Sequence, residues 1–158
     1  MSRDPKLIPI GESAPKFTAL LSNGGTLDLA ELIGSKRVLL IFYPGDETPI
    51  CRAQLCSMRD RWSDFQKVDT LIYGINPASS QSHARFVNHH NLPFSLVIDQ
   101  DKQIARSYGC VGIFGMIRRT VYLIDSNGKV AFSRRGRPGA DILLEKILSI
   151  QDSLKHPI

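Results

Sequence analysis

The chain has no run of about 18 apolar residues, the length that a membrane-spanning helix needs. Residues 1–6 also lack the apolar core of a secretory signal. We therefore expect a soluble, cytoplasmic protein with no membrane segment. Because no proline- or serine-rich stretch and no block of like charge marks an internal boundary, residues 1–158 are expected to form one domain.

Cysteine is scarce: the chain has only Cys51, Cys56 and Cys110. An odd number this small does not suit the disulfide framework of a secreted protein, so catalytic or redox use is favoured. The single C-x4-C pair has no matching Cys/His pair at ligand spacing, which argues against a zinc site. We expect neither a metal nor a cofactor.

The formal net charge is +5, yet only one short basic cluster stands out, at residues 134–137. Aromatic residues do not alternate with the basic ones, and zinc-finger spacing is absent. A short basic cluster is usually a solvated turn, so we do not expect a nucleic-acid partner.

The order of secondary structure predicts an α/β fold. Residues 17–21 and 26–29 flank Ser22-Asn23-Gly24-Gly25 and are expected to form a β-hairpin. Strands are then expected at 37–43, 70–75, 94–98, 120–124 and 129–133, with helices at 49–68, 80–91 and 102–108. This order is thioredoxin-like: a mixed central sheet flanked by helices, with an N-terminal hairpin extension.

Two helices show a clear apolar face. In the first, Leu55, Met58, Trp62 and Phe65 recur at spacings of three and four, which assigns Trp62 to the core. In the closing helix, the expected buried face comprises Ile142, Leu143, Ile147, Ile150 and Leu154. The four histidines show no paired spacing with a cysteine and are expected at the surface.

Cys51 follows a strand that Pro44 ends. Pro49 suits the first position of a helix, which makes Thr48 the expected N-cap and leaves Cys51 in the first turn. Backbone N–H groups there lack partners and favour an anion, so we expect a thiol pKa below the usual value of about 8.5. The sequence thus predicts a nucleophilic cysteine.

The spacing Pro44-x3-Thr48-x2-Cys51 resembles the P-x-x-x-T-x-x-C motif of peroxiredoxins. With Cys56 five residues after Cys51, the chain resembles the bacterioferritin comigratory protein, or peroxiredoxin Q, type over nearly its whole length. The resemblance implies a peroxidatic Cys51, a Thr48 that hydrogen-bonds thiolate and peroxide, and a Pro44 that shields the site. It also implies a catalytic arginine just before a strand.

Fixed hydrogen-bond donors are required by the chemistry as well. Lowering the thiol pKa raises the thiolate population only about thirtyfold, so the remaining rate must come from positioning the O–O bond and stabilising the leaving oxygen. Arg118 and Arg119 alternate in direction on an extended chain, so only one of them faces the site. The family pattern selects Arg118, with Arg119 as the reserve.

By the same resemblance Cys56 is the resolving thiol. Residues five apart on a helix are offset by about 140° and rise about 7.5 Å, whereas a disulfide needs Cα atoms within about 7 Å. We therefore expect the first one or two turns to unwind once Cys51 is a sulfenic acid. A buried core thiol is the alternative for Cys56. For Cys110 a small apolar role is favoured over a backup resolving role.

The resemblance implies reduction of hydrogen peroxide and organic hydroperoxides, with thioredoxin or glutaredoxin as the reductant. A monomer suffices because both thiols lie in one helix. One rival is a thioredoxin-like disulfide oxidoreductase, which would favour C-x-x-C over the C-x4-C found here. Another is a non-catalytic redox sensor or chaperone, which would need the same reactive thiol.

Overall fold

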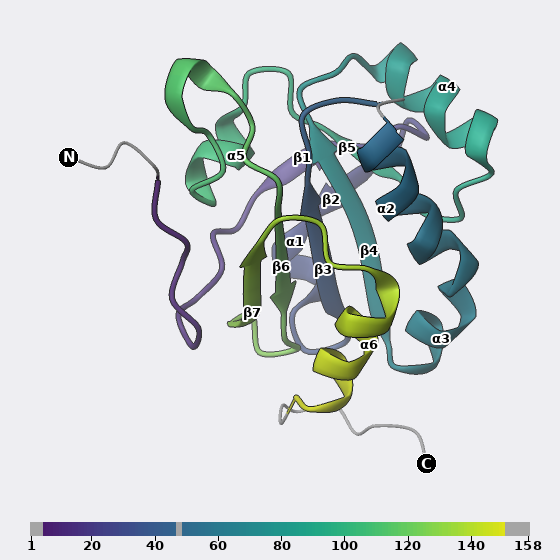
Figure 1. The fold of residues 1–158 in the computed structure, drawn as a ribbon. Helices are drawn as coiled ribbons and strands as arrows, with labels where there is room; N and C mark the ends of the chain where they lie inside the picture. Colours follow the sequence, from purple (N-terminus) through teal and green to yellow (C-terminus); the bar gives the residue numbers. More distant parts are fainter. Residues whose placement is uncertain (1–4, 47–48, 151–158) are drawn as a thin grey trace.

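The computed structural model describes residues 5–46 and 49–150, in which a central sheet carries helices on both faces (Figure 1). The elements in chain order are β1 (Thr18–Leu20), β2 (Thr26–Asp28), α1 (Leu29–Leu32), β3 (Arg37–Phe42), α2 (Pro49–Asp60), α3 (Trp62–Lys67), β4 (Thr70–Asn76), α4 (Ser80–His90), β5 (Leu96–Ile98), α5 (Gln103–Ser107), the 3-10 turn η1 (Ile113–Gly115), β6 (Thr120–Ile124), β7 (Val130–Arg135) and α6 (Ala140–Leu148).

The main sheet has the strand order β5-β4-β3-β6-β7. Strands β3, β4 and β5 run parallel, whereas β6 is antiparallel to both β3 and β7. Strands β1 and β2 form a separate antiparallel hairpin. The mixed sheet and the N-terminal hairpin are both confirmed.

Two apolar cores lie on opposite faces of this sheet. Helices α2, α3, α4 and α6 cover one face, and the N-terminal hairpin with α1 and α5 covers the other (Figure 1). Strand β3 is buried along its whole length because it lies at the centre of the sheet and both of its faces are covered. The end of β3 is therefore a rigid support for the segment that leads to Cys51.

The helix expected over residues 49–68 is two helices, so that prediction is wrong in extent. Helix α2 ends at Asp60 and α3 begins at Trp62, with Arg61 between them outside helical geometry. The Arg61 guanidinium pairs with Asp64 and Asp141. One non-helical residue leaves the apolar spacing intact, so the sequence pattern gives no sign of the break.

The apolar stripe predicted across this break is confirmed. Leu55, Met58 and Phe65 are buried, and Trp62 packs partly buried against the same core, with its ring centroid 5.7 Å from that of Phe94. Trp62 is therefore a structural residue that reports on the core beneath α2 and α3.

The face of the closing helix was predicted only in part. Leu143 and Ile147 are buried and Ile150 packs against them, but Ile142 is 39% exposed and Leu144 takes the buried position instead. Helical geometry places residue 144 on the side of residues 140, 143 and 147. Leu154 lies outside the described residues.

The turn between β6 and β7 follows the prediction from Asn127-Gly128. Gly128 has φ +79°, a conformation that favours glycine. The Asp125 carboxylate accepts hydrogen bonds from the backbone N–H groups of Asn127 and Lys129 at 2.9 and 3.0 Å. Strand β7 itself continues two residues further than expected, to Arg135. Within residues 5–46 and 49–150, no helix combines the length and apolar character that crossing a bilayer requires.

Candidate active site

The candidate nucleophile lies where the central strand leads into a helix. Helix α2 begins at Pro49, as expected, so Cys51 is its third residue and belongs to the first turn. Pro44 stands two residues beyond the end of β3 and is exposed. The N-cap predicted at Thr48, and the side chain of Cys51, lie outside the described residues.

Cys56 lies on the same helix, five residues after Cys51. Its thiol is free and half-buried, which leaves it accessible from outside the core. The next residues along the helix's buried side, Leu55 and Met58, are fully buried against the sheet. The middle of α2 is thus firmly packed, and only its first turns precede this packing.

Asp46 lies between Pro44 and Cys51, and its carboxylate is almost completely buried. Its Oδ1 accepts hydrogen bonds from the Tyr43 hydroxyl at 2.9 Å and from Asn76 Nδ2 at 2.8 Å. Its Oδ2 accepts one from the Ser82 hydroxyl at 2.8 Å and lies 2.8 Å from His83 Nδ1. These contacts join the chain after β3 to the end of β4 and the first turn of α4.

His83 corrects one prediction, because it is fully buried and not at the surface. Helix α4 positions it: the Ser79 side chain caps the helix by accepting from the Ser82 N–H, and His83 follows on the side facing Asp46. His83 lies three residues before the buried Phe86, and this helical spacing was the available signal for its burial.

The pKa of Asp46 reflects these partners. Burial alone raises it, but the hydrogen bond and charge of His83, together with the bonds from Ser82 and Asn76, outweigh burial and lower it below the usual value of 3.8. Asp46 is therefore an ionised carboxylate at neutral pH. It accepts hydrogen bonds at both oxygens, and burial makes those bonds costly to lose.

The two arginines before β6 lie on opposite sides of the chain. In the pairing of β3 with β6, Ile41 lies opposite Val121 and Phe42 lies opposite Thr120. Continued by one residue, this register puts Arg119 opposite Tyr43. Tyr43 and Val121 belong to the core beneath α2, so this register places Arg119 on the face that carries α2.

Arg118 falls on the other face. The methylenes of its side chain lie close to Gly112, because a Cβ built on Gly112 would be 3.1 Å from Arg118 Cδ. Its backbone N–H donates to the carbonyl of Cys110, which belongs to the core opposite α2. The family pattern selects Arg118, whereas the strand register favours Arg119.

Cys110 is a fully buried free thiol in that second core. Burial raises the pKa of its thiol to about 11, although Thr120 and Arg135 act in the opposite direction. Such a thiol is protonated at neutral pH and is a poor nucleophile. The expectation of a small apolar role for Cys110 is consistent with this placement.

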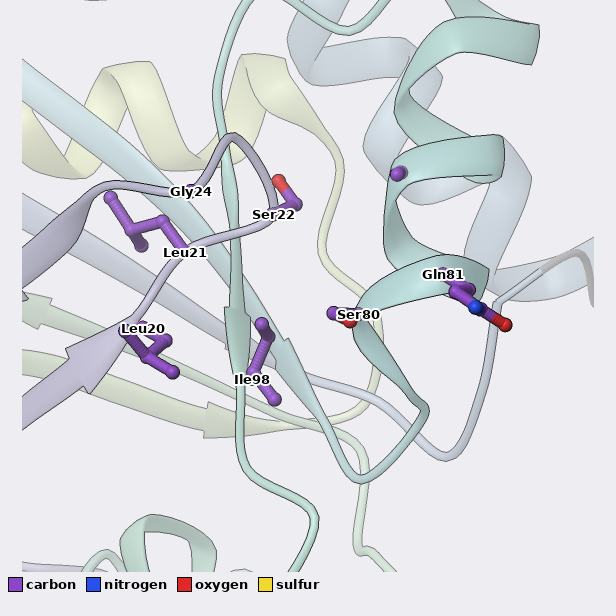
Figure 2. Close-up of a pocket in the computed structure, with 8 residues that line it drawn as sticks. Leu20, Leu21, Ser22, Gly24, Ser80, Gln81 and Ile98 are labelled. Atoms are coloured by element: carbon purple, nitrogen blue, oxygen red, sulfur yellow. The ribbon is translucent and has the colours of Figure 1, made fainter.

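A pocket of about 400 Å³ opens between the turn of the N-terminal hairpin and the first turn of α4 (Figure 2). Leu20, Leu21 and Ile98 form its apolar wall, and Ser80 and Gln81 lie across from them. Of the described residues that line it, none is charged and none is a cysteine. The pocket therefore offers no reactive group.

The chain matches known proteins both in sequence and in fold. The sequence pattern of the AhpC/TSA family matches residues 10–133. The chain is similar to peroxiredoxin Bcp of Bacillus subtilis, with 32% identity over 92% of this chain and 96% of that protein. It is also similar to the chloroplastic peroxiredoxin Q of Sedum lineare, with 33% identity over 92% of this chain and 78% of that protein.

Among solved structures, peroxidoxin BcpB from Mycobacterium tuberculosis superposes with a TM-score of 0.83. It shares 25% sequence identity, and the match covers 90% of this chain and 98% of that one. The likeness confirms the expected thioredoxin-like arrangement of sheet and helices.

Proposed function

This chain is a peroxiredoxin of the AhpC/TSA family, a thiol-dependent peroxidase, and from that premise we propose that Cys51 is its peroxidatic cysteine and Cys56 its resolving cysteine. One observation carries the assignment: α2 begins at Pro49, so Cys51 lies in the first helical turn while Cys56 follows on the same helix. The N–H groups of a first turn favour the thiolate over the thiol.

The proposed cycle begins with attack of the Cys51 thiolate on one oxygen of a hydroperoxide. The O–O bond breaks, the sulfur becomes a sulfenic acid, and the second oxygen takes a proton and leaves as water or an alcohol. The Cys56 thiolate then attacks the Cys51 sulfur; the S–O bond breaks, the hydroxyl takes a proton and leaves as water, and a disulfide forms. An external dithiol returns both cysteines to thiols and is itself oxidised to a disulfide.

The leaving oxygen needs fixed donors. Besides the first-turn N–H groups, we propose Thr48 as a hydrogen-bond partner of thiolate and peroxide, and Pro44 as a shield against water. For the arginine we favour Arg119, because the strand register puts it on the face that carries α2. Arg118, which the sequence pattern selects, is the alternative.

The partners follow from the position of the second thiol. Because Cys56 lies on the same helix as Cys51, resolution needs no second subunit, and we propose that the chain works as a monomer and as one unit over residues 1–158. We propose hydrogen peroxide and organic hydroperoxides as substrates and thioredoxin, or glutaredoxin, as the dithiol. We propose a reducing compartment such as the cytoplasm, since the chain has only three cysteines.

The test adds one equivalent of hydrogen peroxide to the reduced protein at neutral pH. Thiols and Trp62 fluorescence are followed from milliseconds to seconds, and the product is mapped by peptide mass spectrometry. We expect rapid loss of two thiols and a Cys51–Cys56 link that thioredoxin reverses, with Cys110→Ser behaving as the wild type. Oxidation over many minutes, or a link to Cys110, would contradict the assignment and favour a redox sensor.

A further inference from the structure

Asp46 stands at the entrance to the helix that carries both reactive thiols. Only two residues, 47 and 48, separate it from the start of α2 at Pro49. Pro44 and Pro49 bracket this short segment, and proline rings restrict the backbone φ angle to about −65°. Asp46 is therefore a near neighbour, along the chain, of the first turn of α2.

The Asp46 cluster consists of Asp46 and the four side chains that hydrogen-bond to it: Tyr43, Asn76, Ser82 and His83. All four distances are 2.8 or 2.9 Å, and each carboxylate oxygen takes two of the contacts. An ionised carboxylate has about four acceptor sites, so this one is fully used. The cluster joins the segment after β3 to the end of β4 and the start of α4, 30 to 37 positions further along the chain.

The cluster is also sealed from solvent, since the side chains of His83 and Asp46 are 0% and 2% exposed. His83 Nε2 has no hydrogen-bond partner among the residues that the structure describes. Asp46 is thus the partner that satisfies the buried imidazole through Nδ1. Pulling Asp46 away would leave a buried charge and a buried ring both unpaired, which is costly.

We propose that the Asp46 cluster is a clamp that holds the segment leading into α2 and so sets how often the first turns of that helix unwind. The inference rests on the proposed function, in which Cys51 and Cys56 must meet. Asp46 and His83 act as positioning residues: they bind no peroxide but control the helix that carries the thiols.

The clamp acts on the two steps of the cycle in opposite directions. Intact, it favours the helical form, in which Cys51 meets peroxide, and it slows the unwinding that brings Cys56 to the sulfenic acid. A longer-lived sulfenic acid is exposed to a second hydroperoxide, which converts it to a sulfinic acid and releases water or an alcohol. Weakening the clamp should therefore speed disulfide formation and reduce sulfinic acid formation.

The experiment compares the wild type with Asp46→Asn and with the milder Ser82→Ala. The rate of disulfide formation is read from the peroxide-independent second phase of Trp62 fluorescence, and the sulfinic acid fraction at excess hydrogen peroxide is read by mass spectrometry. We expect Asp46→Asn to form the disulfide about tenfold faster, equivalent to about 1.4 kcal/mol, with a matching fall in sulfinic acid. For Ser82→Ala we expect about threefold.

Asp99→Asn is the matched control. Asp99 is also a buried carboxylate, but it accepts hydrogen bonds from the backbone N–H groups of Ile104 and Ala105 at 3.1 and 3.0 Å, at the start of α5. Its substitution should lower the melting temperature without changing the rate of disulfide formation by more than about twofold.

The outcomes separate the inference from the function on which it rests. If the wild type forms the Cys51–Cys56 disulfide but neither Asp46→Asn nor Ser82→Ala speeds its formation, the proposed clamp role is wrong and the proposed function stands. Equal acceleration by Asp99→Asn would also overturn the clamp, because general destabilisation would then explain the effect. A wild type that forms no such disulfide overturns both.

Discussion

Cys51 and Cys56 lie five residues apart on one helix, α2, which separates them by about 7.5 Å along its axis and about 140° around it. Helical geometry directs positions five apart to different sides of the helix, and a disulfide needs Cα atoms closer than about 7 Å. Formation of the bond therefore has to unwind the start of the helix. Leu55 and Met58, buried against the sheet, limit how far the unwinding spreads.

Oxidation to the disulfide should speed the exchange of amide hydrogens with solvent at the start of α2. We expect residues 51–56 to exchange at least about tenfold faster in the disulfide form, while β3 and α4 stay protected, because only the start of α2 has to leave helical geometry. Hydrogen exchange with mass spectrometry measures this. Peroxide-treated Cys56→Ser is the control, since it forms a sulfenic acid but no disulfide. Equal exchange in both proteins would contradict the unwinding.

The two arginines before β6 offer a paired test of the site. Arg119→Met should lower kcat/KM for hydrogen peroxide by about 100-fold, since removing one fixed donor to a developing oxyanion typically costs that much. Arg118→Met should change it less than about threefold, because the register places Arg118 on the opposite face. Stopped-flow rates of the first oxidation step measure both. The reverse ranking would restore Arg118 as the catalytic residue.

A buried tyrosine ties the N-terminal arm to the sheet. The Tyr122 hydroxyl donates to the carbonyl of Tyr108 at 2.6 Å and accepts from the N–H of Ile8 at 3.1 Å. Tyr122→Phe should lower the free energy of unfolding by about 1–2 kcal/mol, because both partners lose a bond. Urea denaturation measures the change.

Tyr73→Phe is the matched control for that substitution. Tyr73 is half-buried and its hydroxyl makes no hydrogen bond to the residues that the structure describes. We expect a change below about 0.5 kcal/mol. Equal losses for the two variants would mean that the Tyr122 hydroxyl bonds contribute nothing specific.

Cys110 should make the stability depend on pH in alkaline solution. Burial raises the pKa of its thiol from the ordinary value of about 9.0 to about 11, so folding favours the protonated form. The raised pKa of Cys110 adds about 3 kcal/mol to the free energy of unfolding below about pH 9. This stabilisation is lost as pH rises towards 11.

The measurement compares urea unfolding of the wild type and Cys110→Ala at pH 8 and pH 10.5. The difference in unfolding free energy between the two proteins should shift by about 2 kcal/mol against the wild type at the higher pH. The alanine variant shares the other alkaline groups, so it cancels their effect. An unchanged difference would show that the thiol ionises without penalty.

Local signals were sufficient to predict much of the site. The apolar run of β3, the prolines after it and the spacing to Cys51 predicted a strand, a turn and a helix start, and the structure has β3 ending at Phe42 and α2 beginning at Pro49. These features depend on backbone geometry within a few residues, which the sequence carries directly. The same holds for the turn at Asn127-Gly128.

Features that join distant segments could not be predicted in this way. Asp46 and His83 are separated by 37 positions, and a lone histidine in a polar stretch gave no sign that a carboxylate would meet it. The choice between Arg118 and Arg119 likewise depends on how β6 pairs with β3. A slip of one residue would reverse it.

The sequence by itself determined where the helix that carries Cys51 and Cys56 begins and how strands and helices alternate, because periodicity and proline geometry act over a few residues. Only the tertiary structure decided which side chains surround the Asp46 carboxylate, three residues before that helix. Buried hydrogen bonds and strand register arise from packing between segments that the chain order leaves far apart. Asp46, held by β4 and α4, is the residue in which that difference is clearest.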